Sequence, residues 1–104
     1  LGGRALIING KTRLYGIIGN PVHHSLSPVM HNAAFGELSI NGVYVPMRVQ
    51  ELTAGLIASL GSFGFIGLSV TVPHKERVMD YLDEIDPVAA KIGSVNTLLF
   101  RTHP

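Results

Sequence analysis

Short apolar runs that are typical of β-strands alternate along this chain with stretches of helical spacing. The strand-like runs cover residues 13–19, 43–49, 65–72 and 94–100. Residues 5–8 form a further short run, which is either an edge strand or a frayed end. Strands that alternate with helices favour a largely parallel, twisted sheet with helices on both faces and right-handed crossovers. We therefore expect an α/β fold.

The segments between these runs repeat apolar residues at helical spacing. Residues 28–40 form the first predicted helix, residues 52–60 the second, and residues 78–85 mark a third. Asp86 and Gly93 bracket a short fourth helix as its cap and its stop. The faces predicted to be buried are Met30, Ala33, Ala34 and Leu38 in the first helix, Leu52, Leu56, Ile57 and Leu60 in the second, and Val78, Leu82 and Ile85 in the third.

Size and composition limit the functions that the chain can have. Its 104 residues fit one domain, and 46% of them are hydrophobic against 14% charged, so a folded globule is expected rather than disorder. The net charge is +1 and the basic residues are scattered, which argues against a nucleic-acid partner. The lack of cysteine excludes disulfides and thiolate zinc sites and is compatible with the cytoplasm. No run is long enough to span a membrane.

Both termini indicate a piece of a longer chain. The first residue is leucine rather than methionine, and the start lacks the charged-then-apolar layout of a signal peptide. The last residues form a short polar tail that ends at Pro104. We therefore expect a single domain taken from a larger protein.

Two polar clusters follow predicted strands, where ligands gather in parallel α/β sheets. Ser25 and Ser27 follow the first strand. Ser27 precedes a proline, which predicts a helix N-cap whose hydroxyl has a purely structural role. Ser25 lies outside that cap, where a hydroxyl beside a helix N-terminus suits an anion such as a carboxylate.

The second cluster is the stretch "SVTVPHK", residues 69–75. Val72 is a poor cap, so the hydroxyl of Thr71 remains available for a ligand. Lys75 falls in the first turn of the predicted third helix, where the macrodipole disfavours a cation by about 0.3–1 kcal/mol. Lys75 is therefore either a solvated surface lysine or a lysine that exchanges a proton with a bound ligand, and spacing does not decide between them.

Asn96 differs from these clusters because it stands near the start of its strand and not after the end. It reaches the same edge of the sheet only if the last strand runs antiparallel to its neighbour, and we expect the last strand region to contain such an antiparallel strand. Pro46 likewise carries topological information, since a proline within a strand favours an edge position or a bulge. The alternative for Asn96 is a turn asparagine that bonds nearby backbone.

The histidines do not indicate a metal site. None of them is paired at the spacing of helical zinc motifs, and His31 is expected to be a packed or surface helix residue. The chain also lacks a Gly-x-Gly-x-x-Gly turn, a Walker loop and a nucleophile elbow, so we expect no nucleotide site within it. The five histidines are His23, His24, His31, His74 and His103.

Three motifs, "YGIIGNPVHHSLSP", "SVTVPHK" and "GSVNTL", occur in this order and resemble the N-terminal, substrate-binding domain of the shikimate dehydrogenase family. The resemblance extends from about residue 13 to residue 100. It implies reversible, NADP-dependent reduction of 3-dehydroshikimate to shikimate in aromatic amino acid biosynthesis. It also implies that residues 1–104 are the substrate-binding domain and that the NADP-binding domain is absent from this chain.

The resemblance implies a role for each residue singled out above. Ser25 and Ser27 correspond to the serines that hold the substrate carboxylate. Thr71 corresponds to the threonine that contacts the ring hydroxyls, and Asn96 to an asparagine that binds substrate hydroxyls. Lys75 corresponds to the catalytic lysine, which also contacts substrate.

Two departures from the family pattern limit what can be transferred. Ser69 stands where the family usually has asparagine, which is expected to alter a loop contact but to remove no principal ligand. The family's Asn-Thr-Asp-Gly stretch, whose aspartate acts with the lysine, is not present in the 104 residues. We therefore expect the isolated chain to be inactive and to bind shikimate weakly. The alternatives are a non-enzymatic module that binds a small organic acid, and a parent enzyme that acts on quinate as well as shikimate.

Overall fold

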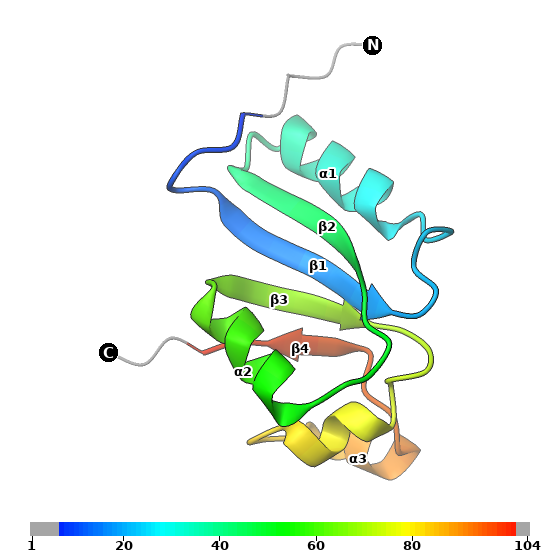
Figure 1. Ribbon diagram of the computed structural model, residues 1–104. Coiled ribbons are helices and arrows are strands. Elements are labelled where there is room, and N and C mark those ends of the chain that lie inside the picture. Colours follow the sequence, from blue (N-terminus) through cyan, green and yellow to red (C-terminus); the bar gives the residue numbers. More distant parts are fainter. Residues whose placement is uncertain (1–6, 102–104) are drawn as a thin grey trace.

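The computed structural model of the protein describes residues 7–101, which form an open four-stranded sheet with helices (Figure 1). Ile7 and Ile8 belong to no strand, and the rest of the apolar run 5–8 lies outside the described residues. Within residues 7–101 no helix has the length and apolarity that crossing a membrane requires. The elements are β1 (Arg13–Gly19), α1 (Ser27–Glu37), β2 (Gly42–Arg48), α2 (Ala54–Ser62), β3 (Phe65–Val70), the 3-10 helix η1 (Arg77–Tyr81), α3 (Pro87–Ile92) and β4 (Thr97–Leu99).

The sheet has the strand order β2-β1-β3-β4. Strand β1 is parallel to both β2 and β3, whereas β4 is antiparallel to β3. The predicted α/β class and the predicted antiparallel last strand are therefore confirmed. Pro46 lies in β2, an edge strand, as a proline that cannot donate to a neighbouring strand requires.

The main core lies on the face of the sheet that α2 covers. Ile18 of β1 and Leu68 of β3 are 0% and 2% exposed, and they belong to one cluster with Ile57 and Leu60 of α2. Thr53 caps α2 by accepting a hydrogen bond from the Leu56 amide at 3.1 Å, so the helix begins after Thr53. Leu52, which was predicted to lie in this helix, therefore precedes it, but it is buried as expected.

Helix α1 packs on the opposite face with a different side from the one predicted. Met30 and Leu38, which were expected to be buried, are 66% and 68% exposed. Phe35 instead packs against Tyr15 of β1, with 5.3 Å between the ring centroids. Since α1 and α2 lie on opposite faces, the prediction of helices on both faces is confirmed even though the buried side of α1 is not.

Asn32 explains the orientation of α1. Its side-chain amide donates to the Tyr44 carbonyl oxygen at 2.8 Å and its oxygen accepts from the Tyr44 amide at 2.9 Å. Strand β2 is an edge strand, so these backbone groups of Tyr44 have no neighbouring strand to bond. Asn32 thus supplies the two hydrogen bonds that another strand would supply, and this pairing fixes which side of α1 faces the sheet.

Replacing Asn32 with alanine is expected to lower the free energy of unfolding by about 1–3 kcal/mol, because two backbone groups lose their partners. Urea denaturation followed by circular dichroism measures this change. Met30→Ala is the matched control, and its exposed side chain predicts a change below about 0.5 kcal/mol. A larger loss for Met30→Ala than for Asn32→Ala would contradict the observed packing of α1.

The predicted third helix is replaced by the short 3-10 helix η1. Val78 is fully buried, but Leu82 is already extended and Ile85 is 36% exposed, so the three residues form no common buried face. A single 3-10 turn suffices to bury Val78, and short segments favour such turns over α-helices. Lys75 precedes η1 in a turn, so it does not lie in the first turn of an α-helix as predicted.

The predicted fourth helix is present as α3. The Asp86 carboxylate accepts hydrogen bonds from the amides of Val88 at 3.1 Å and Ala89 at 3.3 Å. Gly93 ends the helix in the left-handed conformation with φ of 78°, which glycine adopts without steric cost. Both the cap and the stop that the sequence predicts are therefore confirmed.

Candidate functional site

The three polar segments meet at one edge of the sheet, where β1 and β3 end and β4 begins (Figure 1). Two backbone hydrogen bonds extend the pairing of β1 and β3 beyond their last strand residues. The Thr71 amide donates to the Ile18 carbonyl at 3.0 Å, and the Asn20 amide donates to the Val72 carbonyl at 2.9 Å. The loop that carries Ser25 and the turn that carries Lys75 therefore leave the sheet side by side.

Ser27 does not cap α1 as the sequence predicts. Leu26 is the N-cap of α1 and already has helical dihedral angles, so Ser27 lies inside the first turn and cannot cap it. The Ser25 hydroxyl oxygen instead accepts a hydrogen bond from the Ser27 amide at 3.2 Å. Among residues 7–101 the hydroxyl of Ser27 has no partner, and the O–H of Ser25 donates to none.

His31 supports the same turn. Its Nδ1 lies 2.9 Å from the Ser27 carbonyl oxygen and donates to it, and its ring stacks on that of Tyr44 at 4.2 Å with an angle of 9° between the planes. His31 is thus an exposed helix residue that also packs, and both parts of the expectation for it are confirmed.

Thr71 is half-buried directly after β3, and its hydroxyl has no hydrogen-bond partner in the described part of the chain. Its backbone is held on both sides, since its carbonyl oxygen also accepts from the His74 amide at 3.1 Å. His74 is 4% exposed, and its Nε2 donates to the Val49 carbonyl oxygen. This buried histidine anchors the turn between Thr71 and Lys75 to the segment that follows β2.

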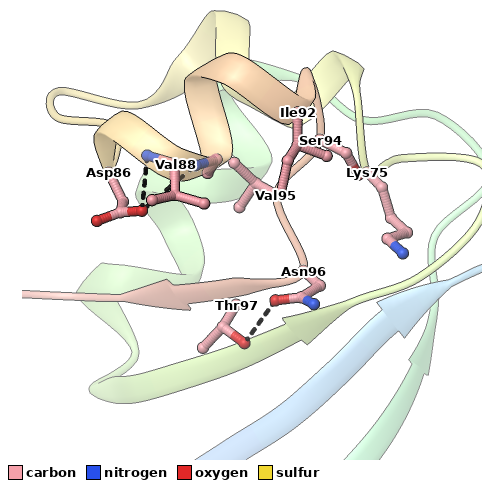
Figure 2. A pocket seen from close by; sticks show the side chains of 9 residues that line it. Lys75, Asp86, Val88, Ile92, Ser94, Val95, Asn96 and Thr97 are labelled. Atoms are coloured by element: carbon pink, nitrogen blue, oxygen red, sulfur yellow. Dashed lines mark hydrogen bonds between the residues drawn. The ribbon is translucent and has the colours of Figure 1, made fainter.

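Lys75 and Asn96 lie in one open pocket of about 410 Å³. The Val95 amide donates to the Lys75 carbonyl at 2.8 Å, and the Val70 amide donates to the Asn96 carbonyl at 2.8 Å. Figure 2 shows the Asn96 amide nitrogen turned toward the side on which the Lys75 amine lies. The antiparallel course of β4 therefore brings Asn96 to the edge that its predicted role requires. Asp86, Val88, Ala89, Ile92, Ser94, Val95 and Thr97 complete the lining.

The structure does not gather all five predicted residues into that pocket. Ser25, Ser27 and Thr71 lie at the same edge of the sheet but are not among the residues that line it. The site thus has two parts, a hydroxyl-bearing part after β1 and β3 and a second part around the Lys75 amine and the Asn96 amide.

The free polar groups at this edge are nearly all hydrogen-bond donors. The Asn96 oxygen accepts from the Thr97 hydroxyl at 3.2 Å, which leaves its NH₂ group available. Lys75 forms no ion pair or hydrogen bond with another side chain within residues 7–101. An ammonium, an amide and three hydroxyls suit a small anionic ligand that is rich in oxygen.

Ser69 has a structural role that the sequence does not indicate. The Tyr44 hydroxyl donates to the Ser69 hydroxyl oxygen at 2.6 Å and thereby joins β2 to β3 across β1. Ser69, which stands where the family usually has asparagine, is thus already hydrogen-bonded within the sheet. The spacing of neighbouring residues in the sequence does not predict a hydrogen bond between two such distant residues.

Metal ligation finds no support in the described residues. Within residues 7–101 no group of three histidine, aspartate or glutamate side chains could hold a metal ion. His23 and His24 pack on each other with 3.9 Å between ring centroids, and His103 lies outside the described residues.

Comparisons with known proteins agree with the motifs at this edge. A family model described as the shikimate dehydrogenase substrate binding domain matches residues 17–98. The shikimate dehydrogenase (NADP(+)) of Pyrococcus furiosus is 48% identical over 93 residues, which are 89% of this chain and 34% of that protein.

Two solved structures extend the comparison to three dimensions. Shikimate 5-dehydrogenase from Listeria monocytogenes, in complex with shikimate and NAD, matches with a TM-score of 0.84 and 36% identity over 88% of this chain and 32% of that one. Quinate dehydrogenase from Corynebacterium glutamicum, in complex with NAD, matches with a TM-score of 0.78 and 30% identity over 85% of this chain and 33% of that one.

All of these matches cover most of this chain. The chain spans about a third of the length of the proteins it resembles, while the family model covers most of the chain itself. The chain therefore belongs to the family of shikimate dehydrogenase substrate-binding domains.

Proposed function

We propose that this chain is the substrate-binding domain of an NADP-dependent shikimate dehydrogenase, which reversibly reduces 3-dehydroshikimate to shikimate on the route to the aromatic amino acids. The observation that carries the proposal is the set of free donors at one sheet edge, provided by β1, β3 and β4. These ammonium, amide and hydroxyl groups match a substrate that has one carboxylate and several ring oxygens. The sequence identity of 48% with the P. furiosus enzyme and the structural likeness to the shikimate-bound L. monocytogenes enzyme support the same substrate.

Each proposed role follows from the position of the group. Ser25 and Ser27 bind the substrate carboxylate from the start of α1, where amides and hydroxyls favour negative charge. Thr71 and Asn96 hydrogen-bond the ring hydroxyls. In the reduction, the Lys75 ammonium donates a proton to the carbonyl oxygen, and in the oxidation the neutral amine accepts the proton of the alcohol.

The described residues do not fit a nicotinamide dinucleotide. The turn from β1 into α1 contains Gly19 and Pro21 but not the three spaced glycines that bring a backbone close to a pyrophosphate. NADPH, bound by another part of the full-length enzyme, supplies hydride to the substrate carbon. We accordingly propose that residues 1–104 hold no cofactor. We also propose that the enzyme works in the cytoplasm, a reducing compartment that suits a chain without cysteine.

Titration of this chain with shikimate, followed by NMR amide shifts, tests the proposal. We expect the amides of Ser25, Thr71 and Asn96 to shift together on one binding curve. Ser27→Ala is expected to weaken binding about tenfold to a hundredfold, because it removes a hydrogen bond to a charged group.

Ser62→Ala is the matched control, since Ser62 is an exposed serine at the end of α2 and its loss should leave affinity unchanged. Shifts confined to other parts of the chain would contradict the proposed site. Binding by this chain without turnover by the full-length protein supplied with NADPH would indicate a non-enzymatic organic-acid module instead.

A quinate-using enzyme is a second candidate, which the likeness to the C. glutamicum quinate dehydrogenase favours. Quinate carries the same carboxylate and neighbouring hydroxyls, so the donors at this edge do not separate the two substrates. Steady-state rates of the full-length enzyme on shikimate and quinate decide between them. Comparable rates on both would replace the proposed name with that of a quinate/shikimate dehydrogenase.

A further inference from the structure

Gly19, the last residue of β1, lies against the side chain of Thr71. A methyl group placed on the Gly19 Cα would overlap the Thr71 Cγ2 methyl, and it would also lie 3.1 Å from the Val72 carbonyl oxygen and 3.2 Å from Val22 Cγ1. The Thr71 methyl therefore occupies the space that any larger residue at position 19 would need. The overlap with Thr71 is the severe one, because the other two distances exceed 3.0 Å and would require their neighbours to move by only a few tenths of an ångström.

The backbone of Gly19 does not itself require glycine. Among the described glycines only Gly64 and Gly93 have positive φ, so an alanine could adopt the conformation of Gly19. What excludes a side chain is the space taken by Thr71. Gly19 therefore differs from the turn glycines, whose role is to permit an unusual backbone conformation.

The orientation of Thr71 depends on this space. Its backbone is held by hydrogen bonds to Ile18 and His74, so rotation about χ1 is its main remaining freedom. In threonine the methyl and the hydroxyl share one carbon, and χ1 is restricted to a few staggered positions. A methyl seated against Gly19 therefore also determines the direction of the hydroxyl, which has no partner within residues 7–101.

We propose that Gly19 is a positioning residue, which accommodates the Thr71 methyl and thereby keeps the Thr71 hydroxyl turned toward the substrate. This inference rests on the proposed role of Thr71 in substrate binding. Gly19 itself touches no substrate and acts only through the rotamer of Thr71.

The Gly19→Ala variant of the full-length enzyme tests the proposal. The added methyl should force Thr71 into another rotamer and raise KM for shikimate about 2- to 10-fold, the value of one hydrogen bond, with a much smaller change in kcat. Three-bond couplings from the labelled Thr71 Cγ2 to its backbone N and C′ report χ1 directly. Gly36→Ala is the control, because a methyl at Gly36 meets no atom within 4 Å.

A second substitution makes the test specific. Thr71→Ser removes the methyl that clashes and keeps the hydroxyl, so the Gly19→Ala/Thr71→Ser double variant should regain the KM of Thr71→Ser alone. Failure of this rescue, or an unchanged χ1 in Gly19→Ala, would overturn the inference. If Gly19→Ala does not fold while the double variant folds, the clash with Thr71 is supported as well.

Two single variants, Thr71→Val and Thr71→Ser, test the proposed function and the inference independently of each other. Thr71→Val removes the hydroxyl but keeps the shape, and an unchanged KM in this variant would refute the substrate role of Thr71 whatever Gly19 does. In Thr71→Ser alone, nothing fills the space against Gly19, so the serine should populate several χ1 rotamers. A single fixed rotamer there would overturn the positioning role even if substrate binding by residue 71 were intact.

Discussion

Replacement of Lys75 by alanine is expected to lower the kcat of the full-length enzyme by about 10²- to 10⁴-fold, the usual contribution of a positioned proton donor. Lys75 shares its pocket with Asn96, and within residues 7–101 it forms no ion pair that would occupy its ammonium group. Because the proton moves only in the chemical step, KM for shikimate should change far less than kcat. Steady-state kinetics in both directions measure the two constants.

Lys91→Ala is the matched control for the loss of a positive charge. Lys91 is an exposed lysine in the last turn of α3, the helix that forms one wall of the same pocket, but it is not one of the lining residues. Its replacement should leave kcat within a few-fold of the unmodified enzyme. A Lys75→Ala enzyme that also stayed within a few-fold would remove Lys75 from the mechanism.

Truncation of Leu68 to alanine is expected to lower the free energy of unfolding of this chain by about 2–5 kcal/mol. Leu68 is 2% exposed at the centre of β3, where it packs with the residues of α2 that cover the sheet. The whole stability of a small domain is about 5–15 kcal/mol, so this loss removes a large part of it and should lower the urea midpoint clearly. Urea denaturation followed by circular dichroism gives the shift of the midpoint.

The control for this truncation lies on the neighbouring strand. Leu99 of β4 pairs with Gly67, next to Leu68, but it faces the other side of the sheet and is 78% exposed. Leu99→Ala should therefore change the free energy of unfolding by less than about 0.5 kcal/mol. Equal midpoint shifts for the two leucine variants would contradict the assignment of the core to the α2 face.

The arrangement of the strands was predictable because each strand has a strong local signal. Runs of apolar and β-branched residues alternate with helical spacing, and parallel strands place their carboxyl ends together. That rule alone predicts that Ser25 and Thr71 lie at one edge of the sheet. It also made the position of Asn96 depend on an antiparallel last strand, which the pairing of β3 with β4 confirms.

The buried side of α1 could not be predicted in the same way. Helical spacing allows one face with Met30 and Leu38 and another with Asn32 and Phe35, and counting apolar residues favours the first. The choice is made by Asn32, which bonds the edge-strand backbone of Tyr44. Asn32 thus faces the sheet because it bonds backbone groups twelve positions away in the sequence. A prediction from the periodicity of apolar residues does not include such a hydrogen bond.

The local errors at the site have a similar origin. Ser27 was expected to cap α1 because it precedes a proline, but the cap depends on the dihedral angles of Leu26, which are already helical. Lys75 was expected in an α-helix because apolar spacing continues after it, whereas only Val78 is fully buried there. In both cases the backbone conformation one or two residues away, and not the residue type, decides the local structure.

The hydrogen bond between the Val95 amide and the Lys75 carbonyl closes a long excursion of the chain that contains η1 and α3. Because this bond holds Lys75 beside the start of β4, insertions or deletions within the excursion need not alter the spacing of Lys75 and Asn96. The same excursion contributes Val88 and Ile92 to the pocket wall. Changes within the excursion can therefore reshape that wall while the spacing of Lys75 and Asn96 stays the same.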